Sequence, residues 1–184
     1  MKRRIAVFAN GWNNLGIAQA LKGIQEVTDK QNIDIFLFLS FAAFSHPESR
    51  QKGDDSIFYL SDYKNFDGAI VFSNMLNTGN NPDNISKLLV ANDVPSVSIG
   101  VPLDGLSYVG IDNYKGMFEM VDHLVKEHHI KNPAFFAGTK EHPDSNERLD
   151  ATRKALSTNG IELKDENIRY TNWESCGFIF LCKK

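Results

Sequence analysis

The stretch VPSVSIGVPLDGLSYVGIDNYKG, residues 94–116, places two short apolar runs on either side of a turn-rich bend and then leads into a helix. Pro102 and Gly105 lie in the bend, between the runs at residues 94–99 and 107–111. Because proline and glycine favour turns, the two runs are predicted to be separate strands. We interpret the stretch as the end of one α/β unit and the crossing into another. Residues 1–110 are therefore expected to form an N-terminal α/β lobe, and residues 111–184 a partial C-terminal α/β lobe.

Strand and helix patterns alternate on both sides of this crossing. A continuous apolar run, typical of a strand buried on both faces of a parallel sheet, occurs at residues 5–9. Mainly apolar runs at residues 33–39, 66–72, 134–137 and 168–170 are also predicted to be strands. Apolar residues at spacings of three and four predict helices over residues 15–31, from residue 81 onward, over 117–125 and over 149–156. Residues 40–56 are expected to form an irregular connection that can include one helical turn, and residues 57–60 a short edge strand. This order predicts an α/β fold with parallel sheets flanked by helices.

Polar residues mark the expected helix ends. Asn81 before a proline, and Asp112 before the helical stripe at 117–125, are predicted N-caps. Asp144 and Glu147 have the spacing of a capping box. Residues 159–160, Asn-Gly, form a credible C-cap.

The composition excludes several classes of function. The chain has 184 residues, is 42% hydrophobic and 23% charged, and carries a formal charge of −3, so no basic face for nucleic acid is expected. No apolar run approaches the ~20 residues of a membrane span. The two cysteines, Cys176 and Cys182, lie too close together to form a disulfide framework. We expect a cytoplasmic protein that binds neither nucleic acid nor membrane.

Ligands of open parallel sheets bind beyond the carboxyl ends of the strands. The loops expected there cover residues 10–14, 73–80, 138–148 and 172–173. Asn side chains donate and accept hydrogen bonds, as polyol recognition requires, although Asn also favours turns. Tryptophan can stack on a sugar face, although it packs in cores more often. His, Asp and Ser occur without the spacing of a metal site or a catalytic triad, so neither an enzyme nor a cofactor is expected.

An ordered set of fragments resembles the effector-binding domain of the LacI/GalR family, which shares the type I periplasmic-binding-protein fold. The fragments are DVPSV at 93–97, VGIDN at 109–113, HL at 123–124, FFAG at 135–138 and RL at 148–149. The resemblance covers nearly the whole chain, from Lys2 to Trp173, and each fragment alone is weak.

The resemblance implies two lobes that close on a small molecule, often a sugar or a nucleoside, and a homodimer. It implies that Arg148 binds the effector, since a guanidinium can form two parallel hydrogen bonds with a carboxylate or vicinal hydroxyls; a solvated arginine is the alternative. It also implies ligand contacts in the loop after the first strand, residues 10–14, and at the aromatic position of Trp173. The predicted ligand-binding residues, including two chosen by topology alone, are Asn10, Trp12, Asn13, Asn14, Ser73, Asn74, Arg148 and Trp173.

The chain departs from the family pattern in its extent. The family's repressors carry an N-terminal helix-turn-helix, whereas the first core strand here begins at Arg4 or Ile5. The resemblance weakens after Trp173, and the rest of the second lobe is missing, so a truncated protein or a sensor separated from its output domain is expected. A sensor module of a cyclic-dinucleotide signalling protein is one alternative. An α/β enzyme acting on a sugar-like substrate is another.

Overall fold

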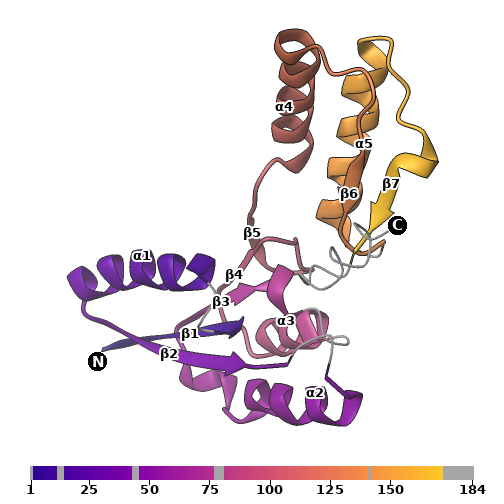
Figure 1. The fold of residues 1–184 in the computed structure, drawn as a ribbon. Coiled ribbons are helices and arrows are strands. Elements are labelled where there is room, and N and C mark those ends of the chain that lie inside the picture. Colours follow the sequence, from indigo (N-terminus) through magenta and orange to yellow (C-terminus); the bar gives the residue numbers. More distant parts are fainter. Residues whose placement is uncertain (1, 12–14, 43–45, 77–80, 141, 172–184) are drawn as a thin grey trace. The chain divides into compact units, whose positions relative to one another are not determined.

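A computed structural model describes residues 2–11, 15–42, 46–76, 81–140 and 142–171. Contacts within the chain divide it into two units, Met1–Gly110 and Ile111–Lys184 (Figure 1). The boundary lies within residues 94–116, the stretch in which the sequence predicts a crossing.

The first unit is a five-stranded, all-parallel sheet with the strand order β2-β1-β3-β4-β5. Its strands are β1 (Arg3–Asn10), β2 (Ile33–Ser40), β3 (Gly68–Phe72), β4 (Ser96–Ile99) and β5 (Ser107–Val109). Its helices are α1 (Leu15–Gln31), α2 (Glu48–Asp55) and α3 (Asn81–Ala91), with the 3₁₀ turns η1 (Ser56–Tyr59), η2 (Tyr63–Asn65) and η3 (Ser73–Met75). The predicted α/β fold is confirmed.

Alternate residues of β1 build two different cores. Val7 and Ala9 are buried with Ile17 of α1. Ala6 and Phe8 point to the opposite face of the sheet, which α3 and the 3₁₀ turns cover (Figure 1). Because side chains alternate along a strand, one continuous apolar run supplies both layers. This explains why the run is apolar at every position rather than at every second one.

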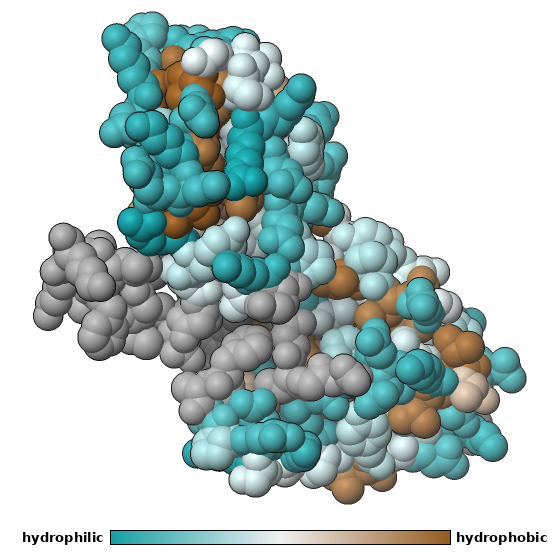
Figure 2. Space-filling model, turned by 90° about the vertical axis from the view of Figure 1, so that its right-hand side faces the viewer, coloured by the Kyte–Doolittle hydropathy of each residue, from teal (hydrophilic) through white to brown (hydrophobic). Residues whose placement is uncertain are grey.

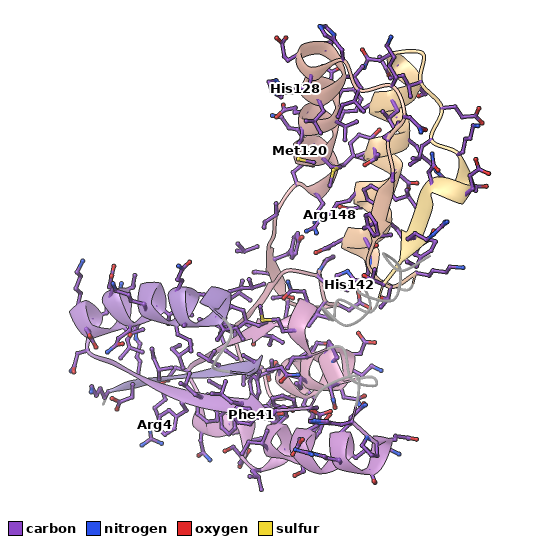
Figure 3. All side chains as sticks on the ribbon, in the orientation of Figure 1. Arg4, Phe41, Met120, His128, His142 and Arg148 are labelled. Carbon is purple, nitrogen blue, oxygen red and sulfur yellow. The ribbon has the colours of Figure 1, made fainter. Side chains whose placement is uncertain are left out.

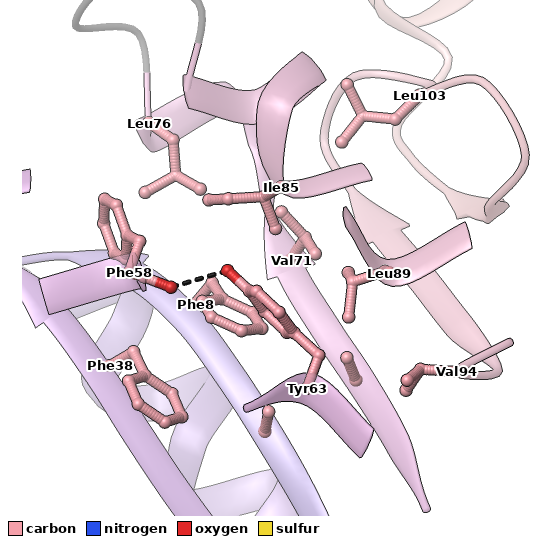
Figure 4. Packing of buried hydrophobic residues seen from close by; sticks show 12 residues of the cluster. Phe8, Phe38, Phe58, Tyr63, Val71, Leu76, Ile85, Leu89, Val94 and Leu103 are labelled. Atoms are coloured by element: carbon pink, nitrogen blue, oxygen red, sulfur yellow. Dashed lines mark hydrogen bonds between the residues drawn. The ribbon is translucent and has the colours of Figure 1, made fainter. Parts of the chain in front are cut away.

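Aromatic rings fill the core on the α3 side (Figure 4). The ring of Phe8 stacks on Phe38 at 5.1 Å and lies 6.2 Å from Phe58 and 5.6 Å from Tyr63, measured between ring centroids. The Tyr63 hydroxyl donates to the carbonyl oxygen of Phe58 at 2.5 Å, and burial raises the pKa of Tyr63 to about 12. The predicted edge strand at residues 57–60 is wrong, because these residues fall in and just after the 3₁₀ turn η1. This tight turn directs Phe58 into the core, while Leu60 stays exposed.

The quoted stretch 94–116 contains β4 and β5, which pair in parallel with Val97 opposite Ser107. The bend between them depends on Gly100, whose φ is +105°. A Cβ atom at this position would lie 2.4 Å from Cγ of Asn74. Only glycine therefore allows β4 to turn so close to the loop that follows β3.

In its described residues, 111–140 and 142–171, the second unit packs two helices beside a two-stranded parallel sheet. Its elements are α4 (Asn113–His128), β6 (Phe135–Ala137), α5 (Pro143–Thr158), the 3₁₀ turn η4 (Asp165–Asn167) and β7 (Ile168–Tyr170). The predicted N-cap is confirmed, since the Asp112 carboxylate accepts from the Lys115 amide at 2.8 Å. The predicted C-cap is also confirmed: Gly160 has φ +72°, and the amide of Ile161 donates to the carbonyl of Leu156 at 2.9 Å.

Three local predictions need correction. Residues 40–56 contain the regular helix α2 rather than only an irregular connection. The helix α3 begins at Asn81 itself and not after it, and the Asn81 side chain bonds Asp55 and Tyr59. The capping box at residues 144–147 is wrong: α5 begins at Pro143, and its N-cap His142 makes no capping side-chain hydrogen bond. Proline is well suited to the first helical turn because it has no N–H to satisfy there.

Candidate functional site

Polar groups gather at the carboxyl ends of the strands in the first unit. Asn10 ends β1 and lies opposite Ser40, which ends β2. The Asn10 side-chain amide donates to the carbonyl of Ala42 at 2.7 Å, and the Gly11 amide donates to the carbonyl of Ser40 at 2.8 Å. The half-buried Asn10 side chain is therefore fixed by the loop after β2. Trp12, Asn13 and Asn14, predicted for the same loop, lie outside the described residues.

A buried carboxylate, Asp55, connects this edge to the start of α3. It is only 5% exposed. One oxygen accepts from the Ser40 hydroxyl and the other from the Asn81 side-chain amide, both at 2.6 Å. The Tyr59 hydroxyl in turn donates to the Asn81 side-chain oxygen at 2.9 Å. Because a buried charge must be compensated by hydrogen bonds, Asp55 has little freedom to move, and it fixes the ends of β2, α2 and α3 together.

The sequence analysis missed Asp55. It stands in a region predicted to be irregular, and nothing in its local sequence separates it from its neighbour Asp54. Asp54 makes only long ion pairs, 3.8 Å to Arg50 and 4.0 Å to His46. No signal in a single sequence distinguishes these two carboxylates, since their difference comes from the tertiary packing of α2.

Ser73, predicted as a ligand contact, is buried in a network of hydroxyl and backbone groups. Its hydroxyl oxygen accepts from the Val101 amide and from the Ser98 hydroxyl, both at 2.8 Å. It also lies 2.7 Å from the carbonyl of Val101. This network holds the turn after β4 against the loop after β3. Ligand contacts by Ser73 and the adjacent, half-buried Asn74 remain predictions.

Arg148 lies in the second turn of α5, which begins at Pro143. Its Nε donates to the Asn113 side-chain oxygen at 2.8 Å. Asn113 is buried at the start of α4, so the pair joins the amino-terminal ends of both helices of the second unit. Figure 3 labels Arg148 on α5.

The hydrogen bond to Asn113 uses Nε and orients the Arg148 guanidinium, so its two terminal nitrogens remain available to a ligand. Within the described ranges, the guanidinium makes no further hydrogen bond or ion pair. Both terminal nitrogens can therefore face a planar or vicinal pair of oxygens, which is the geometry of a carboxylate or of a sugar diol. Trp173, the other predicted contact of this unit, lies outside the described residues.

Other chemistries receive no support from the described part of the chain. No three His, Cys, Asp or Glu side chains come together there as metal ligands. The ring centroids of His123 and His128 lie 5.2 Å apart on α4, but no third metal-binding side chain joins them in the described chain. None of the helices that the structure describes is both long and apolar enough to cross a membrane.

The fold is similar to that of solved sugar-binding proteins. A periplasmic solute-binding protein of an ABC transporter from Actinobacillus succinogenes, with bound D-allose, is 18% identical with a TM-score of 0.75, over 98% of this chain and 63% of that one. A LacI-family sugar-binding regulator from Escherichia coli, in complex with phosphate, is 20% identical with a TM-score of 0.68, over 95% and 60%. A CelR regulator in complex with cellobiose is 20% identical with a TM-score of 0.71, over 99% and 55%.

Sequence comparison adds nothing to this similarity, because no protein-family model and no curated protein matches the chain. The chain spans about 55 to 63% of the length of these three structures. The parallel sheets, their flanking helices and these structures together show that the chain has the fold shared by LacI-family regulators and periplasmic sugar-binding proteins.

Proposed function

We propose that the chain is a non-catalytic sensing domain that binds a sugar or a related small metabolite. The observation that carries the proposal is the Arg148–Asn113 pair, a fixed guanidinium whose outer nitrogens are available to paired oxygens. The fold supports it, since the similar solved structures include proteins in complex with D-allose and cellobiose. We further propose that Asn10 of the first unit and Arg148 of the second contact the same ligand.

The proposed output is regulatory. Ligand binding would favour one conformation of the domain, which an output domain or a second copy reads. A homodimer in the cytoplasm is the setting that we propose for this role. The surface in Figure 2 is mainly hydrophilic, with separate hydrophobic patches.

A thermal-shift screen of pentoses, hexoses, disaccharides and nucleosides tests the proposal. A ligand should raise the melting temperature saturably, because binding to the folded state stabilises it by RT ln(1 + [L]/Kd). The same sugar should be recovered unchanged. Conversion of the sugar into a product would contradict the proposed sensor. So would the lack of a saturable rise in melting temperature with every compound at about 100 mM, which is about 100 times a Kd of 1 mM.

The residue-level test compares two arginines of α5. Arg148→Ala should weaken binding by about 10- to 100-fold, the equivalent of about 1.5–3 kcal/mol for hydrogen bonds to a charged group. Arg153→Ala is the matched control, because Arg153 lies on the same helix as Arg148 and pairs with the exposed Asp165 of η4. Equal affinity of the wild type and the Arg148 variant, by isothermal titration calorimetry, would remove Arg148 from the site. An Asn10→Ala variant with unchanged affinity would remove the shared-ligand proposal alone.

A further inference from the structure

A continuous set of hydrogen bonds connects the half-buried Asn10 to the buried Asp55. The Asn10 side-chain NH2 group donates to the carbonyl of Ala42 at 2.7 Å. The Ala42 amide donates to the Ser40 hydroxyl oxygen at 3.1 Å, and that hydroxyl donates to the Asp55 carboxylate at 2.6 Å. Ser40, Ala42 and Asp55 are each at most 5% exposed. The Asn10 side chain is therefore held by buried groups that have partners of their own.

The Ser40 hydroxyl is the centre of this set because it both donates and accepts. An ionised carboxylate can only accept, so the proton of the Ser40 hydroxyl is directed toward Asp55. The lone pairs of the same oxygen then accept from the Ala42 amide. Without Asp55 the hydroxyl could rotate, because a serine proton turns toward whichever acceptor is near. Asp55 therefore fixes the chain after β2 through Ser40.

The Ala42 carbonyl decides which end of the Asn10 amide faces outward. A carbonyl oxygen only accepts, so it bonds the NH2 group of Asn10 and repels the amide oxygen. Oδ1 of Asn10 consequently points away from Ala42. Within the described ranges, Oδ1 accepts no hydrogen bond. Turning the amide over would bring two oxygens together and leave the Ala42 carbonyl without its donor, so one orientation is strongly favoured.

An acceptor that is fixed in one orientation selects a ligand group that donates. Hydroxyl and ammonium groups donate hydrogen bonds, whereas an ionised carboxylate or phosphate offers acceptors only. Asn10 ends β1 opposite Ser40 of β2, at the strand ends where ligands of parallel sheets bind. The negative charge of Asp55, which is bonded to Ser40, also disfavours an anion at this edge. The first unit therefore suits a neutral or positively charged donor.

We propose that Ser40 and Asp55 are positioning residues that hold Asn10 with its amide oxygen outward, and that the ligand group meeting Asn10 is a hydroxyl or ammonium donor. The inference rests on the proposed function, in which Asn10 contacts the ligand. It adds the chemical class of the group that Asn10 binds and two residues that act through Asn10 without touching the ligand.

The first experiment needs no ligand. Heteronuclear NMR of nitrogen-labelled protein detects the Asn10 side-chain amide as the signal that Asn10→Ala removes. In the wild type its protons should exchange with water at least about fivefold more slowly than those of asparagine in an unstructured peptide. Ser40→Ala should reduce this protection by about the same factor. Asp55→Asn should stay within about twofold of the wild type, because its side-chain oxygen still accepts from Ser40.

Ser86→Ala is the matched control. Ser86 is 3% exposed, and its hydroxyl donates to the carbonyl of Asp83 within α3. Losing this buried hydroxyl should leave the exchange of the Asn10 amide unchanged. Three results would overturn the positioning role: an unprotected Asn10 amide in the wild type, an unchanged rate in Ser40→Ala, or equal acceleration by the two serine variants. The wild-type measurement decides even where a variant does not fold.

The second experiment is a double-mutant cycle with D-allose, the sugar bound in one of the similar solved structures. In isothermal titration calorimetry, Ser40→Ala should weaken binding by about 5- to 10-fold. The same change should have no further effect in the Asn10→Ala background, because both residues act through one hydrogen bond to the sugar. Equal weakening in both backgrounds would show that Ser40 does not act through Asn10.

Deoxyfluoro derivatives of D-allose test the donor claim, since fluorine cannot donate a hydrogen bond. One derivative should bind the wild type at least about fivefold more weakly than D-allose and bind Asn10→Ala about as well as D-allose does. A series without such a derivative would overturn the claim. If the thermal-shift screen selects another sugar, its own deoxyfluoro derivatives replace these. A wild type that binds no compound of the screen refutes the proposed function and the donor claim with it, while the exchange rates decide the positioning of Asn10 independently.

Discussion

Replacing Asp55 by alanine should destabilise the first unit far more than the same change at Asp54. The Asp55 carboxylate is buried and accepts from Ser40 and Asn81 at 2.6 Å each. Its removal leaves a hydroxyl and an amide inside the protein without their acceptor. An unsatisfied buried polar group costs about 1–3 kcal/mol, so we expect a loss of about 2–5 kcal/mol in the free energy of unfolding.

The control lies next to it on the same helix. Asp54 contributes only ion pairs of 3.8 and 4.0 Å with partly exposed partners. Such pairs contribute about 0–1 kcal/mol, so Asp54→Ala should fall within that range. Asp55→Asn should be intermediate, because its amide preserves the acceptor for Ser40 and presents a donor to the Asn81 amide.

Urea unfolding followed by circular dichroism measures all three variants. The midpoints should decrease in the order Asp54→Ala, Asp55→Asn, Asp55→Ala, with similar denaturant slopes. Equal losses for the two alanine variants would refute the reasoning, since they would show that the buried hydrogen bonds of Asp55 contribute no more than the long ion pairs of Asp54.

Two further predictions concern backbone conformation and ionisation. Gly100→Ala should lower the free energy of unfolding by about 2–4 kcal/mol, because it adds a Cβ atom 2.4 Å from Asn74 at a position with positive φ. Gly160 also has a positive φ, but a Cβ atom there would meet open space, so Gly160→Ala should lower it by about 1 kcal/mol. Equal losses in urea unfolding would show that close approach to Asn74 is unimportant. For Tyr63, burial raises the pKa from 10.0 to about 12, so the unfolded state loses its proton first and stability falls as the pH rises from 10 to 12. After allowance for solvent screening, this loss should be about 1–2 kcal/mol. Tyr63→Phe should lack this part of the alkaline decrease, and an unchanged pH profile would contradict it.

The sequence allowed the fold to be predicted where its patterns were long and consistent. The eight residues of β1 and the 17 residues of α1 showed their periods clearly, and Asp112 and Gly160 marked helix ends through local chemistry. Prediction failed at residues 57–60. An apolar run of four residues suits a strand as well as a buried turn, and contact with Phe8, far away in sequence, decides between them.

The candidate site was predictable in its location more than in its chemistry. Topology placed Asn10 and Ser73 at the carboxyl ends of their strands, which the register confirms. The sequence did not reveal that Ser73 anchors the turn after β4, because its partners Ser98, in β4, and Val101, just after β4, lie more than 20 residues further along the chain. Nor did it reveal the Arg148–Asn113 pair, whose members stand on different helices and meet only after α4 and α5 have packed.

The interior position of β1 has a consequence for biosynthesis. Ile5 pairs with Ile35 on one side and with Gly68 on the other, so this strand is synthesised before either neighbour and waits longer for both of them than β3 or β4 does for theirs. At about 5–20 residues per second, its apolar side chains wait several seconds for β3 to emerge. During translation, β1 is therefore the strand of this unit with the greatest need for a chaperone.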